Sequence, residues 1–344
     1  MGELPVQPKP VASASAASAH SKARAPNRRA TIATAVAAVL LTGSLLLLHR
    51  NSSEILFNTR AIDVSFTVAS PYAPFRGIAG LSSLAVKGWS TVRQDGAPDA
   101  FSRDDDEQLY QVNAVTGAGH HGSIGIDDLV VPRDTQIEYI GIDTGAATIL
   151  LHFPPKQAAT LNLAIAGSVV TSVVGGEKRE LDSPSPTDVA IALGDSVQLD
   201  LRYDSKNLTF PTPVEVRGVA WNRDRPTDPN TPGGVVRESS ILSGKISLEE
   251  FKDRYFTIHN GEMIDLGAST GYLRQLSTDG LAFTCQFDGS VSVLTVGAGK
   301  REKNYMPTWL DWLRSRDALL LFWMSSAYIV GLVLAIDRWW KGAE

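Results

Sequence analysis

The chain has 344 residues, of which 43% are hydrophobic, 20% charged and 8% aromatic, a composition that excludes a disordered, collagen-like or disulfide-stapled polypeptide. Its 32 basic residues against 37 acidic ones give a formal net charge of -5, so we expect no nucleic-acid partner. Mean hydropathy is close to zero because two strongly apolar segments near the ends offset a polar remainder.

The first apolar segment covers residues 30–48 and carries no charge. As a helix it would be about 28 Å long, close to the thickness of a bilayer's hydrocarbon core. The segment ends in LLLLHRNSSE rather than in the small residues that signal peptidase requires, so we interpret residues 30–49 as a retained transmembrane helix and not as a cleaved signal peptide. Residues 1–29, rich in Pro, Ala and Ser, are expected to form a disordered cytoplasmic tail.

The second apolar segment covers residues 318–336 and is also free of charge. A buried core helix is the alternative for both segments, but a helix that is apolar on every face then needs protein all round it. Residues 307–316 are expected to form an amphipathic helix on the membrane surface, and residues 337–344 a second cytoplasmic tail. Indole rings favour the headgroup level, and the tryptophans expected there are Trp309 and Trp312 before the span and Trp339 and Trp340 after it.

Small residues recur at every fourth position of the second segment, at Ala327, Gly331 and Ala335. Helices in lipid associate through close backbone approach at such positions. The stripe predicts packing against the first span, another subunit or a second copy of the chain.

Basic residues beside the two segments give conflicting orientations. Those beside the first are Lys22, Arg24, Arg28 and Arg29 before it and Arg50 and Arg60 after it. Those beside the second are Lys300, Arg301, Lys303, Arg314 and Arg316 before it and Arg338 and Lys341 after it. Because the first helix usually dominates, we expect both termini in the cytoplasm and the central region outside. Cys285 is the only cysteine, which favours the periplasm of a bacterium or else a cytosolic domain. With the orientation above, we expect the periplasm, with the chain crossing the inner membrane twice.

The central region predicts a mainly β fold. Residues 61–69 read AIDVSFTVA, with apolar and polar side chains alternating, and similar runs recur up to residue 296. We therefore expect an antiparallel β-sandwich or jelly-roll-like region between the two transmembrane helices. Only residues 248–255 and the segment after Pro307 are expected to be helical.

A Pro-rich stretch, residues 222–234, is interpreted either as a linker or as a long loop inside one domain. As a linker it separates a β-sandwich domain at residues 50–221 from a smaller β subdomain at residues 235–300.

Two local patterns resemble catalytic or cofactor motifs, but their surroundings argue against both. The glycines in TGAGHHGS have dinucleotide-loop spacing, yet a strand and not a helix is expected to follow. Ser269 stands in a nucleophile-elbow pattern, but no histidine follows it in the chain. We therefore expect no catalytic, cofactor or metal site. Trp89 and Trp221 are possible ligand contacts, with burial in the core as the alternative.

The sequence favours a non-enzymatic, membrane-anchored subunit that scaffolds or assembles a bacterial envelope complex for secretion, export or polysaccharide assembly. Its expected partners are the lipid bilayer and other membrane-complex subunits or a second copy of itself. The alternative is a membrane-tethered ligand-binding or sensory module that recognises glycan, lipid or peptide.

Overall fold

The computed structural model describes residues 36–37, 40, 43–44, 48–94, 101–102, 108–117, 120–157, 159–173, 178–205, 207–226, 235–251, 254–298, 301–316 and 318–342. The predicted tail at residues 1–29 and most of the first apolar segment lie outside these residues. The chain divides into two compact units, one of residues 48–318, called the β unit below, and one that combines residues 1–47 with 319–344.

Nearly all regular structure in the β unit is antiparallel strand, which confirms the mainly β prediction. In chain order the strands are β1 (Ser53–Ala61), β2 (Asp63–Val68), β3 (Ile78–Gln94), β4 (Phe101–Ser102), β5 (Leu109–Ala114), β6 (Thr116–Gly117), β7 (His120–His121), β8 (Ser123–Asp128), β9 (Gln136–Asp143), β10 (Ala146–His152), β11 (Thr160–Val173), β12 (Lys178–Tyr203), β13 (Val214–Ala220), β14 (Asn222–Pro226), β15 (Val235–Ser239), β16 (Ile241–Leu248), β17 (Tyr255–Ile258), β18 (Ile264–Asp265), β19 (Ser269–Asp279), β20 (Ala282–Val291), β21 (Thr295–Val296) and β22 (Lys303–Asn304). The described helices include α2 (Trp309–Ser315) in the β unit and α3 (Leu319–Gly342) in the other unit. In the part of the chain that the structure describes, no helix combines the length and the apolar character needed to cross a membrane.

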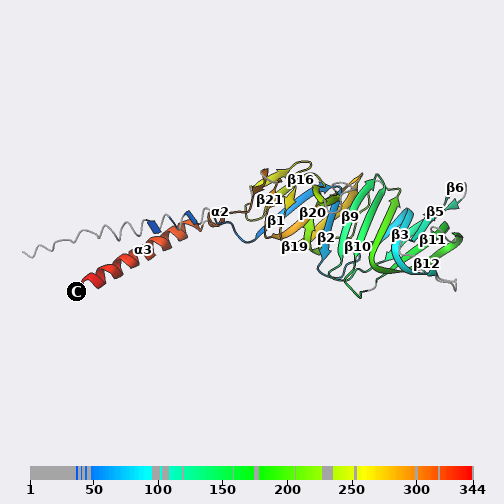
Figure 1. Ribbon diagram of the computed structural model, residues 1–344, viewed down its shortest axis with the longest axis horizontal. Coiled ribbons are helices and arrows are strands. Elements are labelled where there is room, and N and C mark those ends of the chain that lie inside the picture. Colours follow the sequence, from blue (N-terminus) through cyan, green and yellow to red (C-terminus); the bar gives the residue numbers. More distant parts are fainter. Residues whose placement is uncertain are drawn as a thin grey trace, which may run out of the picture. The chain divides into compact units, whose positions relative to one another are not determined.

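One 15-stranded sheet organises the β unit, in the order β17-β16-β1-β20-β19-β13-β2-β9-β10-β12-β11-β5-β3-β4, with β8 beside β11 and β3. The strands β1, β16, β19 and β20 lie at the end of the unit that carries α2, and β3, β5, β11 and β12 lie at the other end (Figure 1). There β3 pairs with both β5 and β12, and β11 also pairs with both, so the pairings of these four strands form a closed ring.

The core of the β unit is continuous and rich in aromatic rings. Tyr139 on β9 contacts the rings of Phe210 and Phe283, with centroids 4.7 and 5.7 Å apart, and stacks on Phe66 of β2 at 5.9 Å. Edge-to-face and stacked pairs of this kind add about 0.5–1.5 kcal/mol each beyond simple burial. Burial of the Tyr139 ring also raises the pKa of its hydroxyl well above the ordinary value, so it stays protonated.

Strands from both sides of residues 222–234 share the large sheet. β1 lies between β16 and β20, with Phe57 opposite Ile246 on one side and Phe287 on the other. β14 and β15, which flank residues 227–234, pair as an antiparallel hairpin.

Among the described residues of the stretch 248–255 none is helical, so the helix expected there was a wrong prediction. The described residues of this stretch close a turn between β16 and β17, in which the Phe251 N–H donates to the Leu248 carbonyl at 3.0 Å and the Arg254 N–H to the Phe251 carbonyl at 2.9 Å. The Glu249 N–H donates to the carbonyl of Glu54 in β1 at 3.1 Å, so pairing with a distant strand overrides local helix propensity. After Pro307 a helix does form, as α2.

Candidate functional site

The two ends of the β unit are joined to each other. Residues 48–50 run antiparallel to residues 307–309, with an isolated bridge between His49 and Thr308. The Arg50 N–H donates to the Pro307 carbonyl at 3.0 Å, and the Trp309 N–H donates to the Leu48 carbonyl at 3.2 Å. The chain therefore enters the β unit and reaches α2 at one place.

Helix α2 begins at this junction with a capping box. The Thr308 hydroxyl accepts from the Asp311 N–H at 3.2 Å, and the Asp311 carboxylate accepts from the Thr308 N–H at 3.2 Å. A helix of 7 residues is too short to be stable by itself, so these bonds and the packing around them fix where it starts.

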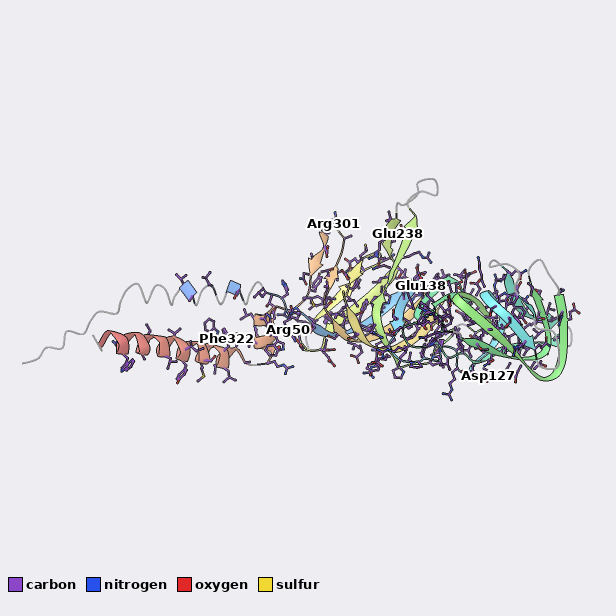
Figure 2. The ribbon with its side chains drawn as sticks, turned by 60° about the horizontal axis from the view of Figure 1, so that its bottom comes forward. Arg50, Asp127, Glu138, Glu238, Arg301 and Phe322 are labelled. Atoms are coloured by element: carbon purple, nitrogen blue, oxygen red, sulfur yellow. The ribbon has the colours of Figure 1, made fainter. Side chains whose placement is uncertain are left out.

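Arg50 is the central residue of the junction (Figure 2). Its guanidinium forms an ion pair with Glu250, and the two side chains are only 18% and 12% exposed. The same guanidinium lies 5.9 Å from the ring centroid of Trp309 and 5.4 Å from that of Trp312. The indoles meet edge to face, with centroids 5.8 Å apart. One cation thus binds a carboxylate and two aromatic rings, an arrangement that suits the planar arginine head better than lysine.

A second ion pair links α2 to the turn before β17. Arg254 donates to the Asp311 carboxylate at 3.0 Å, and its guanidinium lies 5.0 Å from the Phe251 ring centroid. Partial burial raises the pKa of Asp311, but hydrogen bonds from Thr308 and the positive charge of Arg254 outweigh it, so the pKa is below its ordinary value. The carboxylate is therefore ionised at neutral pH. Arg50, Glu250, Arg254, Trp309, Asp311 and Trp312 are called the base cluster below.

The residues predicted for the membrane interface fall in both helices. Trp309 is 39% exposed and belongs to the base cluster with Trp312, while Trp339 is 73% exposed on α3. Trp340 belongs to α3 as well, but its side chain lies outside the described ones.

The predicted packing stripe lies on α3 and is exposed at Ala327, Gly331 and Ala335. A Cβ atom added at Gly331 meets nothing within 4 Å. The stripe therefore has room for contact with another helix.

Both tryptophans proposed as ligand contacts lie in the core, as their alternative interpretation had it. Trp89 is 0% exposed, packs edge to face on Tyr110, and donates from Nε1 to the Gln108 carbonyl at 3.1 Å. Trp221 is 1% exposed and meets the Phe57 ring edge to face, with centroids 4.6 Å apart. Neither indole presents a face to solvent.

Sequence reasoning found Trp309 and Trp312 but missed Glu250 and Arg254, and it gave no contact between Arg50 and these residues. Arg50 and Glu250 are 200 positions apart, so no local pattern links them. The spacing of Thr308 and Asp311 is a readable capping signature, T-x-x-D, and could have located the start of α2.

Surface cavities lie at several places on the described part of the β unit. The base cavity, about 580 Å³, is lined by Glu250, Arg254 and Asp311 together with Arg314. The sheet-face cavity, about 810 Å³, lies over β1, β13, β19 and β20, where Arg274 donates to Asp288 at 2.8 Å. The third cavity, about 840 Å³, lies beside β17 and β22. Among the residues that the structure describes, no group of three or more His, Cys, Asp and Glu side chains is placed to hold a metal ion.

Comparison with known proteins found no matching family model, no similar curated protein and no similar solved structure.

Proposed function

We propose that this chain is a non-enzymatic, membrane-anchored subunit that scaffolds or assembles a bacterial envelope complex serving secretion, export or polysaccharide assembly. The observation that carries the proposal is the junction of residues 48–50 with residues 307–309. Since both connections to the apolar segments start at one place on the β unit, two adjacent anchors would hold the unit by the same end.

In this proposal residues 30–48 and 318–336 cross the inner membrane and both termini are cytoplasmic. This part rests on the sequence of the two uncharged segments, because the described helices alone do not supply a span. The base cluster fits a position at the membrane–water interface. It combines Trp309 and Trp312, which shortly precede the second apolar segment, with the guanidinium of Arg50. The ring of pairings among β3, β5, β11 and β12 supports a sandwich or jelly-roll-like arrangement of the periplasmic region.

The assembly role is supported by the surfaces that the chain leaves available. The stripe at Ala327, Gly331 and Ala335 is exposed, and the uncharged segments contain no residue with which to carry ions or protons. Such helices suit binding to other membrane helices, and the β unit then stands beside that complex.

Cysteine labelling in spheroplasts of a bacterial host tests the anchoring and the orientation. Asn230→Cys is expected to react with a membrane-impermeant maleimide in intact spheroplasts. Glu344→Cys, its matched control, is expected to react only after lysis. The native thiol contributes little background, because Cys285 is 1% exposed and burial raises its pKa to about 12. The full chain is also expected to stay in the pellet after extraction with alkaline carbonate.

Two results would contradict this proposal. Labelling of Asn230→Cys only after lysis, with Glu344→Cys reacting in intact spheroplasts, would reverse the orientation. Release of the chain into the carbonate supernatant would remove the anchors, and with them the assembly role.

A membrane-tethered ligand-binding or sensory module is the second candidate, favoured by the sheet-face cavity. Its rim combines Arg217, Arg274 and Asp288 with the ring of Tyr272, which is 44% exposed and lies 5.4 Å from the Arg274 guanidinium. Planar polar groups beside an aromatic ring suit a polyhydroxylated ligand such as a glycan. Recovery of a bound glycan, without protein partners, from the chain purified in mild detergent would favour this candidate.

A further inference from the structure

The surface cavity beside β17 and β22 is lined mainly by two chain segments. The turn that follows β17 supplies His259 and Glu262, and the segment around β22 supplies Arg301, Lys303 and Tyr305. Its volume is about 840 Å³, within the range of small-molecule sites and far larger than a single inorganic ion needs. Arg301 lies in the same half of the β unit as Arg50 (Figure 2).

The charge of this cavity differs from that of the other two. Carboxylates outnumber basic side chains around the sheet-face cavity and around the base cavity, as their lining residues show. Here the described lining includes the cations of Arg301 and Lys303 and one carboxylate, that of Glu262. In a chain with a net charge of -5, the described lining of this cavity is locally positive.

The Glu262 carboxylate already accepts a hydrogen bond, whereas the side chains of Arg301 and Lys303 are exposed. Glu262 Oε2 accepts from the His259 N–H at 2.8 Å, which closes the turn after β17. Within the described residues, no carboxylate lies within ion-pair distance of Arg301 or Lys303, and both side chains are exposed. Both cations are therefore available to an anionic ligand.

Backbone hydrogen bonds hold the two segments in place. The Gly297 N–H donates to the Met263 carbonyl at 2.8 Å, and the Tyr305 N–H donates to the Leu294 carbonyl at 2.8 Å. Gly297 has a φ of 109°, a conformation that a residue with a side chain rarely adopts. Backbone hydrogen bonds thus join residues on either side of the two cations to neighbouring parts of the β unit.

We propose that this cavity binds a phosphate ester, with the phosphate held by Arg301 and Lys303. Arginine presents a planar fork of donors to phosphate oxygens and lysine a compact positive charge, and both are common phosphate ligands. The space beyond the cations is lined by Tyr305, whose ring packs on Phe256 with centroids 4.4 Å apart. An organic substituent on the phosphate fits against this wall, whereas bare phosphate leaves it uncovered.

The phosphate ester can come from a soluble metabolite or from a phospholipid headgroup. Lys303 and Thr308, beside the base cluster, are only five positions apart, a distance of at most about 18 Å along the chain. The lipid source rests on the proposed membrane anchoring, because it requires the base cluster at the headgroup level. The soluble source is independent of anchoring, so the two proposals can fail separately.

Binding measurements on the full chain in a zwitterionic detergent test the site. The probes are inorganic phosphate, glycerol 3-phosphate and a short-chain phosphatidylglycerol, with phosphatidylcholine of equal chain length as the lipid control. We expect saturable binding of glycerol 3-phosphate or phosphatidylglycerol that weakens as salt increases. R301Q/K303Q is expected to bind roughly tenfold to hundredfold more weakly. The matched control R76Q/K87Q, which removes two exposed cations elsewhere on the β unit, is expected to bind as the wild type does.

The binding results distinguish the two sources of the phosphate ester. Binding of glycerol 3-phosphate supports a soluble source, and binding of phosphatidylglycerol without glycerol 3-phosphate supports the lipid source. Equal affinity for inorganic phosphate and for the esters would contradict the assignment to an ester. Equal binding by the wild type and R301Q/K303Q, when both melt at the same temperature, would overturn the site altogether.

Discussion

Arg50 joins three groups that are far apart in the sequence, the carboxylate of Glu250 and the rings of Trp309 and Trp312. Each contact alone is modest, because a cation over an aromatic ring contributes about 0.5–2 kcal/mol. Their common location matters more, since Arg50 also donates its N–H to Pro307 and so holds the first residues of the β unit against the last. The side chain and the backbone of one residue thus close the same junction.

Replacing Arg50 with Met is therefore expected to destabilise the β unit. The Glu250 carboxylate, whose side chain is only 12% exposed, would then lack its cation. We expect the free energy of unfolding to fall by about 1–3 kcal/mol. The free energy of unfolding of Arg50→Lys should lie between those of the wild type and of Arg50→Met, because lysine keeps the charge but cannot reproduce the planar contact. Thermal unfolding of the full chain in detergent, followed by near-UV circular dichroism, measures both variants.

Arg76→Met is the matched control for this prediction. Arg76 is exposed, so its loss should leave the melting temperature within error of the wild type. If Arg50→Met and Arg76→Met have the same melting temperature, the junction contributes nothing to stability and the base cluster loses its structural role.

Single strands with regular alternation could be predicted from the sequence. Residues 61–69, whose alternation predicts a strand, contain β2. β1 was missed because Ser53 and Thr59 share its buried face with Ile55 and Phe57, which breaks the apolar pattern. Two polar residues on the inner face make a strand difficult to recognise without knowledge of its partners.

The base cluster shows the same limit for a candidate site. Tryptophans at helical spacing could be recognised directly, since Trp309 and Trp312 lie three positions apart in one short segment. The charged half of the cluster depends on the turn after β16, where a helix was expected instead. Pairing of β1 with β16 and β20 brings Arg50 to that turn, and such long-range pairing leaves no trace in a local window.

Helix α3 is the element on which the assembly role can be tested. Gly331→Leu is expected to reduce the recovery of co-purifying membrane proteins, or of a second copy of the chain, by at least about fivefold, because a bulky side chain prevents close helix approach. No clash within the described chain opposes the change, since a Cβ at Gly331 meets nothing within 4 Å. Quantitative affinity purification from mild detergent measures the loss.

Ile329→Leu is the control on the same helix, because it alters a large residue that is already 58% exposed. Both variants should appear in the membrane fraction in wild-type amounts. Unchanged recovery of every partner with Gly331→Leu would mean that the stripe of small residues takes no part in assembly.

At the scale of the whole molecule, the sheet order does not follow the chain order. β1, near the start of the β unit, completes a three-strand set with β16 and β20, both of which come after residues 222–234. β13, which precedes that stretch, pairs with β19 beyond it. Each such strand buries apolar side chains worth about 1.5–3 kcal/mol apiece, so separating the two parts of the chain would expose a large core.

Cleavage between β14 and β15 tests whether these parts form one cooperative unit. A specific protease site is placed within residues 227–234 of a fragment that covers residues 48–318 and lacks both apolar segments, so that detergent and anchors cannot hold the pieces together. After cutting, we expect both pieces to elute as one species in gel filtration, to separate only under denaturing conditions, and to melt in a single transition. The reason is that β1 lies between β16 and β20 and β13 pairs with β19, interactions that cleavage does not touch. Separate elution of two folded pieces would instead assign residues 50–221 and 235–300 to independent domains.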